Sequence, residues 1–439
     1  MPRTELLDRL RIASAFLIGL TLPISVSLSE IFCGLGFVVL LAEWRPALAW
    51  EQLRRNRVAW AALALFVILG LGTLYSTAPG REAVRSWFRY RELLYLPLFM
   101  LICRDAKAQR AGLYGFFGGV VLILAVGTTP LYRPLAHLVG VIIGRIPRDS
   151  AFGSYITEGM LVALATYFFT VEAIRHRKHR KIAIVLVVWG LLYALFLNTG
   201  RTGYVVLIIA AVMLLAQLAP RKFWLPGAAL IIIAAGIFTF LSPRMHERMM
   251  GVGRALEGAA PITAGSQSGS YQGNSGHQAP DTGQMDLSMM RAGDPISLAQ
   301  SSANSRIEFL RLGAEAFLQH PILGTGTGSF ERTYAVLAAQ HHVLPTSNPH
   351  NEYVLIAVQT GAVGLAALLV FFLVLWQQSR KLPLWEARQA QVLVLSFAVA
   401  CLFNSLLMDH KDGHTFAFLV SLFFSGAYLR EDQRRHYDL

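Results

Sequence analysis

Long apolar segments alternate with short polar ones along most of the chain. We count twelve apolar segments, each predicted to be helical, at 12–28, 31–43, 58–76, 93–103, 112–128, 152–173, 181–198, 203–219, 223–241, 353–377, 389–408 and 414–429. A helix needs about 20 apolar residues to cross a hydrocarbon core of roughly 30 Å, so the segments at 31–43 and 93–103 are short for a full crossing. The pattern predicts an all-α polytopic membrane protein with about twelve transmembrane helices.

A long polar stretch separates the ninth apolar segment from the tenth. We therefore divide the chain into an N-terminal transmembrane bundle at 1–241, a loop domain at 242–352, and C-terminal transmembrane helices with a short tail at 353–439. Within the loop, residues 258–300 are rich in Gly, Ser and Gln, show no helical or strand period, and predict a flexible insert. Apolar residues recur at helical spacing from Asn304, which predicts an amphipathic helix ending before Pro321.

Composition and charge agree with a membrane protein. Hydrophobic residues make up 54% of the chain and charged residues 15%, and the net charge is +13. The basic residues are spread over many short loops, which does not indicate nucleic-acid binding. If both termini are cytoplasmic, 23 of the 39 Lys and Arg residues lie in cytoplasmic segments, as the positive-inside rule requires. No cleavable signal peptide is evident, and the three cysteines in apolar segments indicate no disulfide framework.

Basic residues on the outer face oppose this topology and need another explanation. Arg81, Arg85 and Arg89 recur at a spacing of four residues along one helix face, and Arg91 follows two residues later. Like charges so arranged repel one another unless an anion lies between them. A lipid headgroup and a specific phosphate are both consistent with the pattern.

Two further arginines are candidate anion ligands. Arg201 lies in a very short outer turn between two apolar segments. Arginines at the hydrocarbon boundary usually face the bundle interior and have an anionic partner, and we favour this over snorkelling. Arg306 is predicted in the first turn of the amphipathic helix, where the helix dipole favours an anion. We therefore favour it over Arg311, which can pair with Glu308 or Glu315.

The polar run at 348–353, Asn-Pro-His-Asn-Glu-Tyr, leads directly into the tenth apolar segment. Pro349 disfavours helix before it, so the imidazole of His350 is expected at a helix mouth. By itself the run is also consistent with a simple helix cap. The outer arginines favour a reactive site, because arginine matches phosphate oxygens and histidine moves protons near neutral pH. The natural substrate class is a lipid-linked phosphate or diphosphate.

Other polar patterns give weaker signals. The run Gly324-Thr-Gly326-Thr-Gly328-Ser329 lacks the preceding strand and following lysine of a nucleotide loop, so it predicts a tightly packed turn. The remaining histidine and aspartate groups, His341 with His342 and Asp409, His410, Asp412 and His414, are predicted to be solvated rather than to bind a metal. We predict no metal and no cofactor.

Several motifs together resemble a known family. They are Pro349-His350-Asn351-Glu352-Tyr353, Gly361-Ala-Val-Gly364-Leu365, Thr199-Gly200-Arg201-Thr202-Gly203, the Arg306 helix and Gly324-Thr-Gly326. In these motifs the chain resembles the O-antigen ligase and polymerase superfamily, and most closely its lipopolysaccharide O-antigen ligase branch. The resemblance implies a GT-C-like, metal-independent inverting glycosyltransferase of the bacterial inner membrane with a periplasmic active site. The implied donor is O-antigen on undecaprenyl diphosphate, the implied acceptor is lipid A-core, and membrane lipids surround the protein.

The resemblance also implies roles for individual residues. By position, His350 corresponds to the catalytic base, and Arg201 and Arg306 correspond to diphosphate ligands. Asn351, Tyr353 and Arg311 are further candidate substrate-binding residues, as are the four arginines at 81–91 on charge and position alone. Two alternatives remain open: an O-antigen polymerase with the same donor, and a non-enzymatic transporter or flippase for lipid-linked oligosaccharide. A transporter would be expected to show internal repeats, and we see none.

Overall fold

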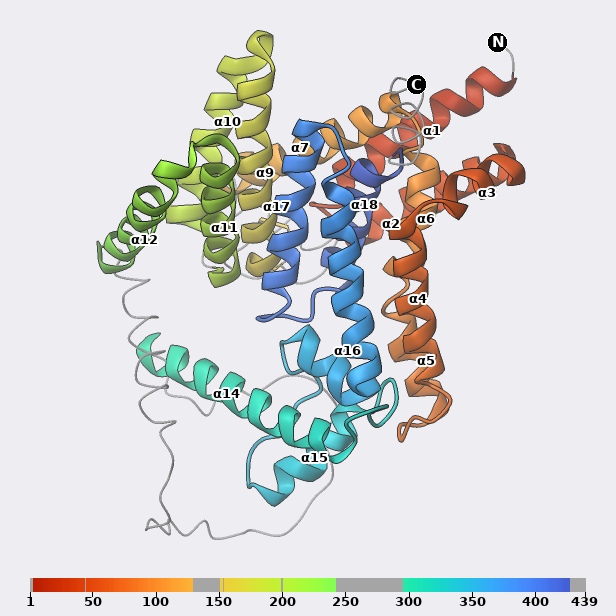
Figure 1. Cartoon of the computed structure of the whole chain (residues 1–439), viewed down its shortest axis with the longest axis vertical. Coiled ribbons are helices and arrows are strands. Elements are labelled where there is room, and N and C mark those ends of the chain that lie inside the picture. Colours follow the sequence, from red (N-terminus) through yellow and green to blue (C-terminus); the bar gives the residue numbers. More distant parts are fainter. Residues whose placement is uncertain are drawn as a thin grey trace. The chain divides into compact units, whose positions relative to one another are not determined.

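The computed structural model describes residues 3–43, 45–128, 151–152, 154–198, 200–241 and 295–426. Over these residues all regular elements are helices (Figure 1), which confirms the predicted all-α class. The chain divides into two compact units. The first unit consists of Met1–Ile231 with Leu312–Leu439, and the second of Ile232–Arg311.

The helices follow one another with short connections. The N-terminal ones are α1 (Arg3–Thr21), α2 (Val26–Glu43), α3 (Pro46–Arg54), α4 (Arg57–Leu71), α5 (Gly80–Phe88), α6 (Glu92–Ile102) and α7 (Ala106–Thr128). Next are α9 (Tyr155–Arg175), α10 (Arg180–Leu192), a π-helical turn at Tyr193–Leu197, α11 (Arg201–Leu218) and α12 (Trp224–Leu241), with 3-10 turns at Arg177–His179 and Arg221–Phe223. The last are α14 (Pro295–Gln319), α15 (Phe330–Gln340), α16 (Glu352–Ser379), α17 (Leu384–Ala400) and α18 (His410–Phe424).

The twelve predicted apolar segments correspond to α1, α2, α4, α6, α7, α9 to α12 and α16 to α18. Within the described residues, six helices are long and apolar enough to cross a membrane: α2, α7, α9, α11, α16 and the run Arg177–Leu197 that contains α10. By length and composition, these helices indicate a multi-pass membrane protein.

Several helix boundaries differ from the prediction. The predicted segment 12–28 contains the break between α1 and α2, α4 ends at Leu71 rather than at 76, and two further differences lie near the candidate site residues. α17 ends at Ala400 rather than at 408, and the following residues form a connection whose polar side chains hydrogen-bond to other segments. α14 begins at Pro295 rather than near Asn304, because proline suits the first helical position, where no N–H donor is needed. The predicted flexible insert at 258–300 is therefore helical over its last six residues. The rest of the insert lies outside the described residues.

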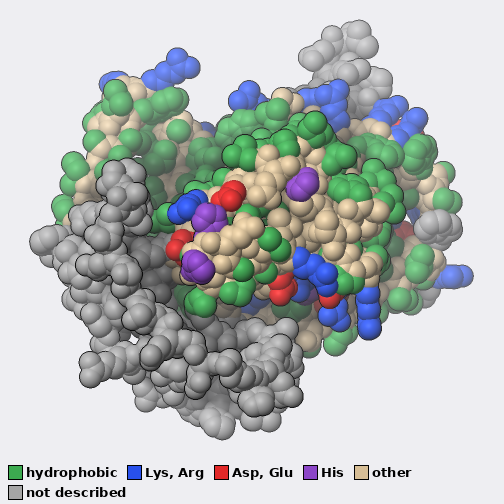
Figure 2. All heavy atoms as spheres, turned by 90° about the horizontal axis from the view of Figure 1, so that it is seen from below, with side chains coloured by type: hydrophobic (Ala, Val, Ile, Leu, Met, Phe, Trp, Pro, Cys, Tyr) green, Lys and Arg blue, Asp and Glu red, His purple; other side chains and the backbone are tan. Residues whose placement is uncertain are grey.

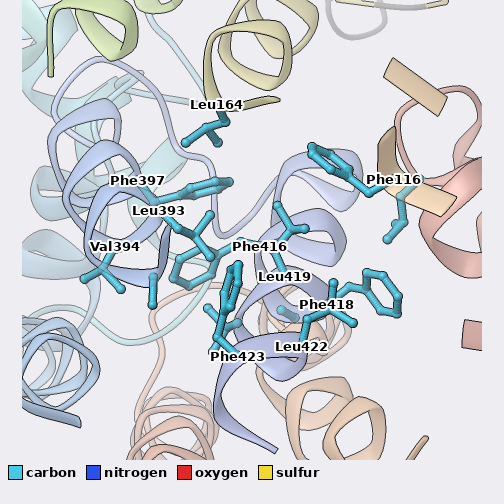
Figure 3. Packing of buried hydrophobic residues seen from close by; sticks show 14 of the residues in the cluster. Phe116, Leu164, Leu393, Val394, Phe397, Phe416, Phe418, Leu419, Leu422 and Phe423 are labelled. Carbon is cyan, nitrogen blue, oxygen red and sulfur yellow. The ribbon is translucent and has the colours of Figure 1, made fainter. Parts of the chain in front are cut away.

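The core of the first unit is built around α9 and α18. α18 is buried from Lys411 through Phe424, and α9 is buried over most of its length. Figure 3 shows the α18 side chains between those of α17, α9 and α7. The ring centroids of Phe416 and Phe397 are 4.4 Å apart, and those of Phe423 and Phe168 are 5.9 Å apart. Close packing of this kind stabilises helix association where lipid removes the hydrophobic driving force.

Ion pairs join segments at one end of this core. Arg104 pairs with Glu43, and Arg175 lies 3.4 Å from Glu386. Arg104, Arg175 and Glu386 lie in segments predicted to be cytoplasmic by charge, 104–110, 175–181 and 380–388, and Glu43 lies next to another, 45–57. The polar segments at 89–91, 198–202 and 348–353 each contact residues 404–408. They contain the candidate site residues.

Candidate active site

His350 lies in a strained turn immediately before α16. Its φ is +51°, a left-handed conformation that is uncommon for a residue other than glycine, and its side chain is exposed. The His350 amide donates to the Asn348 side-chain oxygen over 2.8 Å. Backbone strain of this kind persists only where the surroundings enforce it, and it gathers at functional sites.

Asn351 caps α16 next to this histidine. Its side-chain oxygen accepts from the Val354 amide, and its side-chain nitrogen donates to the Leu402 carbonyl over 3.0 Å. Both ends of this amide group therefore have partners within the protein. Tyr353 donates through its hydroxyl to the Ala398 carbonyl over 2.7 Å. The structure thus gives Asn351 and Tyr353 roles in fixing the start of α16.

The connection at 401–409, which we call the α17–α18 loop, holds the His350 turn from the other side. Ser405 donates to the Asn348 side chain over 2.9 Å, so Asn348 receives hydrogen bonds from both the loop and the His350 amide. The Glu352 amide donates to the Cys401 carbonyl over 2.8 Å. The loop therefore fixes the backbone on both sides of His350.

Arg201 is the first residue of α11 and is partly buried. The turn before it is held by Asn198, which accepts from the Gly200 amide over 2.7 Å and donates to the Tyr155 carbonyl over 2.9 Å. Asn404, in the α17–α18 loop, donates to Thr202 beside Arg201 over 3.1 Å. One loop thus contacts both the His350 turn and the helix start that carries Arg201.

The four arginines at 81–91 differ in their surroundings. Arg81 and Arg85 are exposed on α5. Arg89 directly follows α5, and its guanidinium lies 3.7 Å from the Met408 sulfur. Arg91 forms an ion pair with Glu30 of α2 and lies 3.2 Å from His410. Arg91 therefore already has an anionic partner within the protein.

Tyr90 and Glu352 form a buried hydrogen bond between the α5–α6 turn and α16. The Tyr90 hydroxyl donates to one Glu352 carboxylate oxygen over 2.8 Å, and the Leu407 amide donates to the other over 2.9 Å. Burial, together with the Glu352 charge, raises the pKa of the Tyr90 phenol well above its ordinary value, so the phenol remains a donor.

α16 is broken at Gly361, where φ is +61° and ψ is −157°. The backbone groups freed by the break are satisfied by residues 321–326 through Thr325 N to Val358 O (3.0 Å), Gly326 N to Gln359 O (2.7 Å) and Ala362 N to Pro321 O (2.8 Å). Helix breaks at membrane depth are tolerated where other protein segments satisfy the backbone in this way. The break separates residues 352–360, which begin next to His350 and which we call the outer part of α16, from the rest of the helix.

The glycine loop, residues 324–329, supplies these partners. Gly324, Gly326 and Gly328 have φ values of +68°, +94° and +86°, which side-chain-bearing residues rarely adopt. Thr327 donates through its amide to the Gly72 carbonyl over 2.9 Å and through its hydroxyl to the Leu69 carbonyl over 2.6 Å. The predicted tightly packed turn is confirmed, and it joins the end of α4 to the outer part of α16.

The prediction that Asp412 and His414 are solvated is wrong. They are 4% and 1% exposed, because α18 begins at His410 and packs its first turns against α6 and other helices of the bundle. Asp409 caps the helix, and Thr157 of α9 donates to Asp412 over 3.1 Å. Across the described residues, no group of three or more His, Cys, Asp or Glu side chains is arranged to hold a metal ion.

Arg306 and Arg311 belong to the second unit. Because α14 begins at Pro295, Arg306 lies several turns inside the helix and not in its first turn. The prediction that Arg306 lies in the first turn is therefore wrong, and the helix dipole does not favour an anion there, since its effect is confined to that turn. The role of Arg306 now rests on the family resemblance alone.

Figure 2 shows the end of the molecule that is lowest in Figure 1. On the part of this face that is drawn in colour, histidine, acidic and basic side chains lie close to one another, with hydrophobic side chains around them. In the first unit, the structure brings together the segments of His350, Arg201, Arg89 and Arg91 through the α17–α18 loop and the Tyr90–Glu352 bond.

Three acids at this end have no role in the prediction from sequence. Glu92 and Glu352 are buried and Glu30 is partly exposed. Glu30 pairs with Arg91, Glu92 lies beside His410, and Glu352 accepts from Tyr90. Their positions at the edges of apolar segments were an available signal, because ionisable residues at membrane depth are uncommon and usually functional.

Comparison with known families adds one finding. Residues 186–369 match the family model described as O-antigen ligase. The match begins in α10 and ends within α16, so it includes Arg201, Arg306, the glycine loop and His350. A comparison with curated proteins gives no match.

Proposed function

Since the chain belongs through this match to the O-antigen ligase and polymerase superfamily, we propose that it acts as an O-antigen ligase. It transfers O-antigen polysaccharide from undecaprenyl diphosphate to a sugar hydroxyl of lipid A-core. The family by itself indicates a glycosyltransferase-like enzyme of O-antigen assembly and does not distinguish a ligase from a polymerase. The choice of the ligase branch rests on the motifs at 199–203 and 349–365.

His350 is the proposed general base. Its imidazole takes the proton from the acceptor hydroxyl while that oxygen bonds to the anomeric carbon of the donor sugar. The bond from this carbon to the diphosphate oxygen breaks on the opposite face, which inverts the configuration. An exposed histidine at a fixed helix start suits this role, since it meets substrate from outside while its backbone stays in place.

Arg201 is a proposed ligand of the diphosphate leaving group. Its guanidinium neutralises charge as the carbon–oxygen bond breaks, a part that a metal ion takes in other enzymes. Arg306, in the second unit, is proposed as a further ligand of the diphosphate, as the resemblance implies. The observation that supports this reading best is the α17–α18 loop, which contacts both the His350 turn and the start of α11.

We further propose that both termini are cytoplasmic and that the His350 end faces the periplasm. Ion pairs between Arg104 and Glu43 and between Arg175 and Glu386 support this, because each joins residues in or next to segments predicted to be cytoplasmic by charge. Lipid-linked O-antigen and lipid A-core are then both reached from the periplasmic side of the inner membrane.

The test of the proposed function is glycan transfer by the purified full-length protein. The donor is O-antigen on undecaprenyl diphosphate, offered in parallel with lipid A-core and with a second carrier-linked glycan. We expect transfer to lipid A-core, unchanged by a chelator. Transfer to the carrier-linked glycan alone would identify a polymerase, loss of transfer on chelation would contradict the metal-independent mechanism, and no transfer to either acceptor would contradict the enzyme assignment.

Arg201→Lys is expected to lower the rate of transfer by about 10- to 100-fold. Lysine keeps the charge but lacks the planar fork that binds two phosphate oxygens at once. Arg221→Lys, at the start of the 3-10 turn before α12, is the matched control and is expected to keep the wild-type rate. Equal rates for Arg201→Lys and wild type, measured by donor consumption, would contradict bidentate diphosphate binding.

A further inference from the structure

Glu352 is a buried acid that connects the segment of the proposed base, His350, to the arginine turn at 89–91 and to the α17–α18 loop. It is fully buried, it lies two residues after His350, and it begins α16. Its two carboxylate oxygens accept from neutral donors, the Tyr90 hydroxyl at 2.8 Å and the Leu407 amide at 2.9 Å. Burying a carboxylate among neutral donors is costly, so a helix start would be more simply built with an uncharged residue.

The partners of Glu352 explain what its position achieves. Tyr90 is 1% exposed and lies directly between Arg89 and Arg91 in the chain. Leu407 lies in the α17–α18 loop, one residue before the methionine whose sulfur Arg89 approaches. One carboxylate therefore joins the His350 helix start, the arginine turn and the loop. No other contact described above joins all three.

We propose that Glu352 is a positioning residue, which acts with Tyr90 to set the separation between the His350 imidazole and the arginine turn at 89–91. The inference rests on the proposed function, in which His350 is the base. The two oxygens of Glu352 matter because each accepts from one donor, whereas an amide presents an N–H to one of the two donors. The Tyr90–Glu352 hydrogen bond holds His350 in place, and neither Tyr90 nor Glu352 contacts the substrate.

The test uses Tyr90→Phe, Glu352→Gln and the double variant, with kcat and KM for the donor measured separately. We expect each single variant to lose about 10- to 100-fold in kcat with KM within about twofold of wild type, because a misplaced base slows the chemical step. The double variant is expected to lose no more than the worse single variant, since both remove one interaction. Tyr114→Phe on an exposed face of α7 and Glu386→Gln are the controls.

Three outcomes would overturn the proposal. They are a wild-type kcat in both single variants, a change confined to KM, and independent losses that multiply in the double variant. Thermal unfolding of wild type, Tyr90→Phe, Glu352→Gln and the double variant gives a second measurement that needs no activity. If the wild-type protein transfers no glycan, the proposed function is contradicted whatever the variants do. Strictly additive shifts in the unfolding temperature would separately show that Tyr90 and Glu352 do not act as a pair.

Discussion

His350→Ala is expected to lower glycan transfer by about 10³-fold while the protein still folds. A positioned general base contributes roughly 10²- to 10⁴-fold to a rate. The imidazole that alanine removes is exposed, so its loss leaves no cavity in the core. The backbone bond to Asn348 uses the amide of residue 350 and survives the change. The measurement is transfer of labelled O-antigen to lipid A-core by purified protein.

His342 provides a matched control for this experiment. It is also an exposed histidine with a left-handed backbone, with φ of +55°. His342→Ala should therefore carry the same backbone cost and the same loss of an imidazole, and should leave the rate unchanged. Comparable transfer by His350→Ala and His342→Ala would rule out His350 as the base.

Gly326→Ala is expected to destabilise the first unit by about 3 kcal/mol or more. At φ of +94° an alanine is strained in itself, and its Cβ would collide with the Ser76 backbone. The glycine loop would have to move away from residues 72–78, which would break its bonds to α4 and α16. The measurement is the thermal unfolding temperature of detergent-purified protein.

Gly80 is the matched control for the glycine loop. A Cβ at Gly80, the first residue of α5, would meet no atom within 4 Å. Gly80→Ala should leave the unfolding temperature close to that of wild type or raise it slightly. An unfolding temperature for Gly326→Ala equal to that of Gly80→Ala would show that the loop is not rigidly packed.

The helices of this protein could be predicted well from the sequence. All twelve apolar segments correspond to helices, and α14 ends before Pro321 as predicted. These features depend on local composition and on proline, which act over a few residues. The glycine loop was also predicted as a packed turn, because three alternating glycines have few other uses in a segment without a nucleotide motif.

The contacts of the candidate site could not be predicted in the same way. The Tyr90–Glu352 bond joins residues 262 positions apart, and no local pattern marks either partner. Asp412 and His414 were misjudged because a polar sequence between two apolar segments predicts a loop, whereas α18 begins there and packs against its neighbours. The start of α14 was misplaced because helix-forming polar residues without an apolar period give no signal of a boundary.

The break in α16 has a consequence for how far related proteins can diverge. The outer part of that helix is held to residues 321–326 by amides and carbonyls of the main chain. Such bonds do not depend on which side chains are present, so substitutions at Thr325 or Val358 leave them available. What cannot change freely is the set of left-handed glycines at 324, 326, 328 and 361. A distant relative can therefore keep the same spacing between its histidine and the helix break even where most of the surrounding side chains differ.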